Sequence, residues 1–291
     1  MHVEIAGTAG FCFGVRNAIR KAGEAALKAE GPVYTYGPLI HNVQALGDLE
    51  KQGVYALKEG QSVPEGGTVV IRAHGISREE EDYLKSLNIT LLDATCPFVK
   101  KIHRLVQGAE EETRVIIFGD RNHPEVKGIR GWCREEPLIF KDPQELKTAL
   151  ESENCLKGPF LVVAQTTFDR YRFENMVDML QQRTAGIKVC NTICEATMQH
   201  QQEAVEIARR SDVMVVLGGR SSSNTAKLVE LCRQHCPQTV FAETGADLPG
   251  DLLEGLGEKT RVGITAGAST PDQVIREAAE RIQSCIKGDK A

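Results

Sequence analysis

The chain has 291 residues, a length sufficient for large hydrophobic cores in two or three domains. Its residues are 41% hydrophobic and 26% charged, as in ordinary globular proteins. Its net charge of −5, without any basic tract, argues against nucleic acid as the main ligand, because phosphate backbones require clustered Lys and Arg. It has no bilayer-length apolar run and no signal-peptide pattern, so we expect a cytoplasmic protein with neither a nucleic-acid nor a membrane partner.

The first predicted elements are a short strand around Val3 and Ile5, a glycine-containing turn and a helix. This order usually forms a phosphate-binding turn, but here Cys12 stands at the start of the helix, in "GFCFGV". The dipole and free amides of a helix N-terminus favour a thiolate. Cys12 is therefore a candidate metal ligand; the alternative is a small buried hydrophobic residue.

The next signals are two histidines and a second cysteine at a helix start. His41 lies in "YGPLIHN", and His74 follows the apolar run of "GTVVIRAHG". Their turn-like surroundings beside predicted strand ends suggest a shared task, such as binding a multiply charged anion. Cys96 lies in "DATCPFVKKIHRLV", where Pro97 suits the first position of a helix.

The middle of the chain adds polar residues beyond two more apolar strands. His123 and Glu125 follow the strand in "TRVIIFGDRNHPEV", and Thr166 and Thr167 end "FLVVAQTT". A lone Glu is usually a solvated charge, but its position beyond a buried strand makes Glu125 a candidate for proton transfer. Thr166 and Thr167 offer hydroxyls of the same kind as the phosphate-binding candidates that follow.

The last third begins with the third cysteine. Cys194 lies in "NTICEATMQHQQEAVEIARR", where Thr192 and Glu195 have the spacing of a capping box. Two polar clusters follow apolar strands: "SSSN" comes after "MVVLGG", and "AST" precedes Pro271. Both suit phosphate oxygens, and both are also ordinary helix caps. Their candidate residues are Ser222, Ser223, Asn224 and Ser269.

Alternation of apolar strands and helices predicts an α/β fold with mainly parallel sheets covered on both faces. In such folds ligands bind at the carboxyl ends of the strands. The spacing of Cys12, Cys96 and Cys194 divides the chain into three similar α/β domains, 1–95, 96–192 and 193–291. Three thiolates suit an iron–sulfur cluster with one open iron, or a zinc ion that a histidine also binds.

The remaining cysteines and histidines receive no chemical role. Cys232 and Cys236 lie on one face of a predicted helix and indicate core packing. Cys133, Cys155, Cys190 and Cys285 lie at unit edges, a strand end or the last helix. His103, His200 and His235 fall within helical patterns, which indicates packing or surface positions.

As a set, these motifs resemble one known family over residues 10 to about 275. "GFCFGV", "GPLIHN", "RAHG", "DATCP", "HPEV", "QTT", "TIC-x-AT", "SSN" and "TAGAS-x-P" occur in the order seen in the LytB/IspH family of 4-hydroxy-3-methylbut-2-enyl diphosphate reductases. The chain departs from the common pattern at Asn122, Val43 and Ile129, none of which is a proposed ligand.

The resemblance implies a trefoil of the three domains around one central 4Fe-4S cluster with an open iron. It implies Cys12, Cys96 and Cys194 as ligands, and Glu125 with Thr166 as the proton-supplying pair. The implied substrate-binding residues are His41, His74, His123, Thr167, Ser222, Ser223, Asn224 and Ser269.

The implied reaction removes the allylic hydroxyl of the substrate and gives isopentenyl and dimethylallyl diphosphates, the last step of the non-mevalonate pathway. The partners would be that allylic diphosphate and an electron donor such as ferredoxin or flavodoxin. Two alternatives remain from the residues themselves: a zinc-dependent hydrolase of a phosphorylated metabolite, and a non-catalytic iron–sulfur redox sensor.

Overall fold

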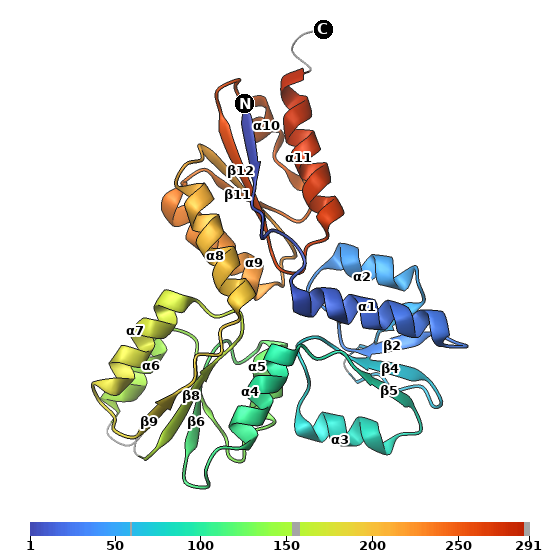
Figure 1. The fold of residues 1–291 in the computed structure, drawn as a ribbon, viewed down its shortest axis with the longest axis vertical. Helices are drawn as coiled ribbons and strands as arrows, with labels where there is room; N and C mark the ends of the chain where they lie inside the picture. The colour runs from blue at the N-terminus through green and yellow to red at the C-terminus, as the bar shows by residue number, and fades with distance from the viewer. Residues whose placement is uncertain (59, 153–157, 288–291) are drawn as a thin grey trace. The chain divides into compact units, whose positions relative to one another are not determined.

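The protein forms three four-stranded sheets, and every strand pairing among the described residues is parallel. The computed structural model describes residues 1–58, 60–152 and 158–287 (Figure 1). The chain divides into two compact units. Unit 1 comprises Met1–Arg16, Ile40–Lys51 and Glu195–Ala291, and unit 2 comprises Asn17–Leu39 and Gln52–Cys194. The predicted α/β class with parallel sheets is confirmed.

The sheet of unit 1 has the strand order β1-β12-β10-β11. Its strands are β1 (His2–Ile5), β10 (Val213–Leu217), β11 (Thr239–Ala242) and β12 (Arg261–Ala266). Helices cover both faces (Figure 1), as the continuous apolar strands predict. The helical elements of unit 1 are α2 (Val43–Glu50), α8 (Glu195–Ala208), α9 (Ser223–His235), the 3₁₀ turn η1 (Gly245–Asp247), α10 (Gly250–Glu254) and α11 (Asp272–Lys287).

Alternate residues of β10 explain how this sheet holds two helical layers. Val213 and Val215 pack with the residues of α10 and α11, whereas Met214 and Val216 pack with α8 and α9. Cys232 and Cys236 belong to the second of these clusters and are 0% and 2% exposed. The predicted packing role of these two cysteines is confirmed.

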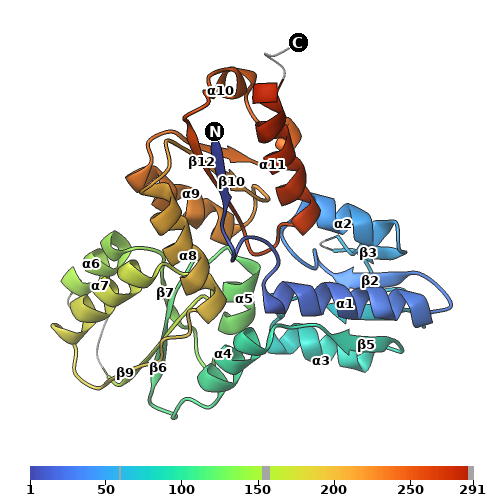
Figure 2. The ribbon, with the colours of Figure 1, turned by 45° about the horizontal axis from the view of Figure 1, so that its top comes forward.

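Unit 2 contains the other two sheets, with orders β3-β2-β4-β5 and β7-β6-β8-β9. The strands are β2 (Val33–Tyr36), β3 (Val54–Ala56), β4 (Thr68–Ile71), β5 (Thr90–Asp93), β6 (Arg114–Phe118), β7 (Leu138–Phe140), β8 (Phe160–Ala164) and β9 (Ile187–Val189). The helices are α1 (Phe13–Lys28, which begins in unit 1), α3 (Arg78–Ser86), α4 (Pro97–Gln107), α5 (Pro124–Arg130), α6 (Pro143–Glu151) and α7 (Arg170–Gln181). In Figure 2, α6 and α7 lie on the opposite side of the β6–β9 sheet from α4 and α5.

The three sheets repeat one strand order, which the sequence did not reveal. Read from the edge inward, the orders are β1-β12-β10-β11, β5-β4-β2-β3 and β9-β8-β6-β7. In each sheet, the edge strand named first leads to a cysteine: β1 to Cys12, β5 to Cys96 and β9 to Cys194. The N-terminal strand β1 does not join the sheet that follows it in sequence but pairs with β12. This pairing covers an edge of β12 that would otherwise present unpaired backbone groups.

One local prediction is wrong. Thr192 does not cap the helix that begins at Glu195; its hydroxyl donates to the Ala164 carbonyl (2.6 Å) and accepts from the Ala164 amide (2.8 Å). The side chain thus extends the β8–β9 pairing by one step, because a parallel neighbour offers both a donor and an acceptor at that point. Among the described residues, no helix has both the length and the hydrophobicity needed to cross a bilayer.

Candidate functional site

The three candidate cysteines have the same backbone contact. Each amide donates, at 3.0 Å, to a carbonyl just beyond the neighbouring strand: Cys12 to Ala268, Cys96 to Ala73 and Cys194 to Thr166. The residue after each acceptor is itself a predicted site residue: Ser269, His74 or Thr167. In every sheet, the edge strand and its neighbour therefore hold a thiol beside a polar group that was predicted to bind substrate.

All three cysteines also stand at helix N-termini, as predicted. Cys12 directly precedes α1, Cys96 caps α4 with Pro97 as the first helical residue, and Cys194 directly precedes α8. The three thiols are half-buried and none is in a disulfide. The Cys96 side chain makes no capping hydrogen bond. Such thiols suit a soft metal centre, because helix dipoles stabilise thiolates and soft metals prefer sulfur.

Two of the other described cysteines are disfavoured as metal ligands by burial. Burial raises the pKa of the Cys133 and Cys232 thiols to about 12, so both stay protonated and poor as ligands. Cys190 and Cys285 are half-buried. Cys155 lies outside the described residues.

Unit 1 brings together His41, Ser222, Ser223, Asn224 and Ser269. The loop after β10 turns at Gly218 and Gly219, and a Cβ on Gly219 would lie 2.5 Å from the His41 carbonyl oxygen. That oxygen also accepts a hydrogen bond from Ser269 Oγ at 3.1 Å. Only glycine permits this approach, so the "GG" before "RSSSN" is what brings the α9 N-terminus against His41.

The α9 N-terminus has the chemistry of an anion site. Ser222 caps the helix by accepting from the Thr225 amide at 3.2 Å. Asn224, in the first turn, is 4% exposed, and neither its Oδ1 nor its Nδ2 has a hydrogen-bond partner within the described protein. A buried amide without partners costs free energy, and a ligand that pairs with it removes the cost. A helix N-terminus favours a negatively charged ligand.

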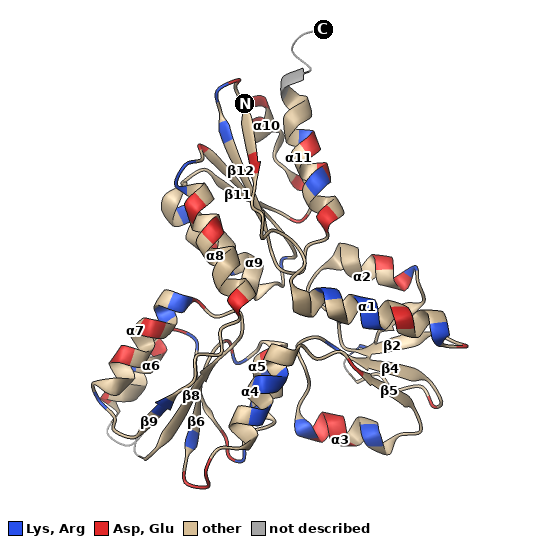
Figure 3. Cartoon of the chain, viewed as in Figure 1, with Lys and Arg blue, Asp and Glu red and all other residues tan. Residues whose placement is uncertain are grey.

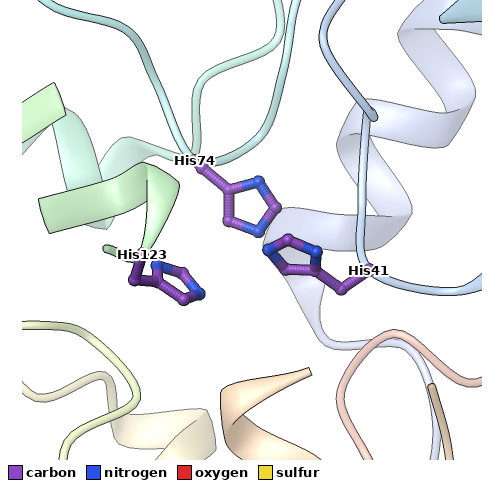
Figure 4. A group of neighbouring side chains, drawn as sticks. All are labelled: His41, His74 and His123. Carbon is purple, nitrogen blue, oxygen red and sulfur yellow. The ribbon is translucent and has the colours of Figure 1, made fainter. Parts of the chain in front are cut away.

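Unit 2 brings together His74, His123, Glu125, Thr166 and Thr167. The rings of His74 and His123 meet edge to face, with centroids 5.5 Å apart (Figure 4). His123 caps α5, and its Nδ1 accepts from the Glu125 amide at 3.2 Å. The proton of the neutral ring is therefore on Nε2, which makes this nitrogen a donor to an anionic ligand.

Glu125 and Thr166 form the buried polar centre of unit 2. Thr166 donates to the Glu125 carboxyl twice, from its amide (2.6 Å) and from its hydroxyl (2.7 Å). Glu125 is 2% exposed. Burial raises the pKa of its carboxyl from 4.5 to about 7, although both bonds from Thr166 lower it. Near neutral pH a large fraction of Glu125 is thus protonated and can act as an acid.

Thr166 also connects this acid to a cysteine. Its carbonyl accepts from the Cys194 amide, while its amide and hydroxyl bind Glu125. Gln165, the preceding residue, is not among the predicted site residues; it accepts from the Asp120 amide (3.1 Å) and donates to Thr167 Oγ1 (2.9 Å). Gln165 fixes the hydroxyl of Thr167; its place in "QTT" was the only available signal.

Comparisons with known proteins identify the family of the chain. A family model described as "LytB protein" matches residues 3–283. The 4-hydroxy-3-methylbut-2-enyl diphosphate reductase of Nitratidesulfovibrio vulgaris (strain DSM 19637 / Miyazaki F) is 42% identical over 285 residues, covering 97% of this chain and 98% of that protein. The reductase of the same name from Aquifex aeolicus (strain VF5) is 38% identical over 288 residues, covering 98% and 96%.

Two solved structures are also similar. One, of (E)-4-hydroxy-3-methyl-but-2-enyl diphosphate reductase, described as the terminal enzyme of the non-mevalonate pathway, has a TM-score of 0.69 at 38% identity and covers 98% of this chain and 100% of that one. The E-1-hydroxy-2-methyl-but-2-enyl-4-diphosphate reductase from Plasmodium falciparum has a TM-score of 0.88 at 29% identity and covers 96% and 87%. The chain therefore belongs to the LytB protein family.

Proposed function

We propose that the protein reduces 4-hydroxy-3-methylbut-2-enyl diphosphate to isopentenyl and dimethylallyl diphosphates by removing the allylic hydroxyl. The family match and the names of similar proteins support this reaction over a zinc-dependent hydrolase or a non-catalytic sensor. The main structural support is the hydrogen-bonded link from Glu125 through Thr166 to Cys194. It connects an acid with a pKa near 7 to a candidate cluster ligand through a single residue.

Cys12, Cys96 and Cys194 would hold a 4Fe-4S cluster that keeps one iron open. When bound, such a cluster supplies the electrons of the reduction and a Lewis acid for the substrate oxygen. The fit rests on three thiols at helix N-termini, each fixed by an amide-to-carbonyl bond. The other described cysteines lack this arrangement.

The predicted polar residues would bind and orient the substrate. Asn224, Ser222 and Ser223 would donate to the diphosphate, together with His41, His74 and His123. Ser269 would join them by turning its hydroxyl from the His41 carbonyl to the ligand. The reaction takes up two electrons and two protons. Glu125 would donate one proton to the departing hydroxyl oxygen, because a neutral water molecule leaves more readily than hydroxide, and the second proton would form the new carbon–hydrogen bond. Thr166 would hold the carboxyl in place, and Thr167 would position the substrate hydroxyl. The anchored diphosphate turns binding into orientation at the reacting carbon.

The reaction needs an electron donor. The basic surface of α4 in unit 2 favours docking of an acidic electron carrier, such as ferredoxin or flavodoxin. This helix follows Cys96 directly and carries three basic residues and no acidic residue (Figure 3). Lys100 pairs with Asp93 at 2.5 Å, whereas Lys101 and Arg104 are exposed and pair with no described carboxylate. Phe98, 43% exposed, adds an apolar contact. Uncompensated charge of this kind steers an oppositely charged partner.

The decisive experiment is an anaerobic one. Protein purified without oxygen should be brown, contain iron and acid-labile sulfide, and convert the allylic diphosphate to the two isomeric products when a reductant is present. Zinc in place of iron, with phosphate release, would support the hydrolase instead. A cluster that is reduced without any turnover would support the sensor.

A further inference from the structure

Asn42 is not one of the predicted site residues. Its side-chain oxygen has a hydrogen-bond partner among the described residues, whereas its side-chain nitrogen has none. It caps α2 from an extended backbone (φ −154°, ψ 119°), and its Oδ1 accepts from the Ala45 amide at 2.9 Å. Its Nδ2 is buried and has no hydrogen-bond partner within the described protein. The whole residue is 2% exposed.

Capping alone does not explain an asparagine at this position. Ser, Asp and Asn cap helices about equally well, because only the side-chain oxygen is used. Asn additionally brings an NH₂ group with two donors, and burial without a partner costs free energy. An asparagine is favoured here only if its Nδ2 acquires a partner that the described residues do not supply, such as a ligand.

The surroundings of Asn42 in unit 1 indicate what this partner is. The backbone of Gly219 lies against His41 and Asn42, since its added Cβ would be 3.5 Å from the Asn42 Cα. Ser269 Oγ donates to the His41 carbonyl. Asn224, in the first turn of α9, is the second buried amide of this unit without a partner for Nδ2. The N-terminal regions of two helices therefore each present an unused amide donor, a combination suited to an anion.

The repeated strand order gives a second argument. Asn42, His123 and Ser222 are the caps of the helices that follow β2, β6 and β10, which occupy the same position in the three sheets. The caps after β6 and β10 already belong to the proposed substrate site. Asn42 stands at the third equivalent position.

We propose that Asn42 is a further substrate-binding residue whose Nδ2 donates to a phosphate oxygen of the diphosphate. The inference rests on the proposed function, because it takes the diphosphate end of that substrate as the ligand. The N-terminus of α2 would then contribute to diphosphate binding through Asn42, beside the proposed contact from His41.

Asn42→Asp separates this role from helix capping. Aspartate keeps the capping oxygen and the size of the side chain, but it loses both donors and adds a negative charge. The probe is inorganic pyrophosphate, titrated calorimetrically into the anaerobic, cluster-containing protein. We expect the thermal midpoint of Asn42→Asp to stay close to that of the wild type, while pyrophosphate affinity falls by roughly 10- to 100-fold, as for a lost hydrogen bond to a charged group. Asn88→Asp, at an exposed position of unit 2, controls for the added charge.

Three results decide the matter, with Asn224→Ala measured in parallel. Loss of affinity in Asn42→Asp at unchanged thermal stability supports the proposal. Wild-type affinity in Asn42→Asp, with loss in Asn224→Ala, overturns the role of Asn42 and leaves the proposed function standing. No measurable pyrophosphate binding by the wild type would overturn both, because the diphosphate site itself would be absent.

Discussion

Glu125 shows how one residue acquires its chemistry from burial. In water its carboxyl would be ionised at neutral pH, but inside unit 2 it is buried and accepts hydrogen bonds from the amide and hydroxyl of Thr166. Loss of hydration outweighs these two bonds and holds the pKa near 7. The residue is therefore a proton donor because of its position.

The first prediction concerns activity. Glutamine at position 125 keeps the size of the side chain but cannot donate a proton as an acid. We expect Glu125→Gln to assemble its cluster while turnover falls by roughly 10²–10⁴. In the wild type, turnover should fall as pH rises through about 7, because Glu125 loses its proton there. Steady-state kinetics from pH 6 to 9 measure both effects, with exposed Glu135→Gln as the matched control.

The same pKa predicts how stability depends on pH. The folded pKa lies above the ordinary value of 4.5, so the folded protein holds this proton more tightly than the unfolded chain does. The stability from Glu125 is fully present below about 4.5 and is lost as pH rises through about 7. Glu125→Gln should therefore show a shallower decline of its thermal midpoint across this range. Turnover close to wild type, or a loss matched by missing iron, would contradict the acid role.

At the scale of elements, the loops beyond parallel strands depend on anchors from neighbouring helices. The loop between β1 and α1 leads to Cys12, and Glu203 of α8 holds it. The Glu203 carboxylate accepts from the Gly7 amide (2.8 Å), the Thr8 amide (2.8 Å) and the Thr8 hydroxyl (2.5 Å). One carboxylate thus fixes the approach of the chain to a proposed cluster ligand.

The prediction at this scale is that Glu203→Ala loosens that loop. Loss of three charge-assisted bonds at a partly exposed site should cost about 1–3 kcal/mol of stability. Cys12 should then hold its metal less tightly, because a disturbed supporting contact commonly costs a metal site 10- to 100-fold in affinity, an order-of-magnitude figure. The rate of iron loss to a chelator and the thermal midpoint measure these effects. Glu206→Ala on the same helix is the control, and equal iron loss in both variants would contradict the anchor.

For the whole molecule, the proposed cluster distinguishes three cysteines from the rest. Cys12→Ser, Cys96→Ser and Cys194→Ser should each lower iron and sulfide content severalfold, because serine is a poor ligand for iron–sulfur clusters. Cys133→Ser and Cys285→Ser should keep near-normal content. Metal and sulfide analysis of anaerobic preparations measures this. Normal content in Cys96→Ser would rule out the three-ligand model.

A second prediction at this scale concerns the electron carrier. Reversal of two charges on α4, in Lys101→Glu/Arg104→Glu, should raise the Michaelis constant for an acidic carrier by roughly tenfold at low salt. The rate with a small chemical reductant should not change. The difference should shrink at high ionic strength, where screening weakens attraction between exposed charges. Exposed Lys141→Glu is the control; equal effects of the two variants would contradict docking at α4.

The sequence by itself determined the local features. Continuous apolar runs such as "MVVL" and "FLVVA" predict buried parallel strands, because side chains on both faces must be apolar. Pro97 after Cys96 predicts the start of α4, because proline fits the first helical position. The order of polar motifs indicated the family. These features depend on neighbours in the chain, so short segments suffice to specify them.

Only the tertiary structure decided which distant segments meet. The pairing of β1 with β12 joins residues near opposite ends of the chain, and neither strand alone specifies its partner. Thr192 has the spacing of a cap, yet the Ala164 backbone offers its hydroxyl a better pair of bonds. The raised pKa of Glu125 and the unused amide of Asn42 likewise exist only through burial by segments far away in sequence. Burial and hydrogen bonding depend on what surrounds a group in space, and chain folding fixes those surroundings.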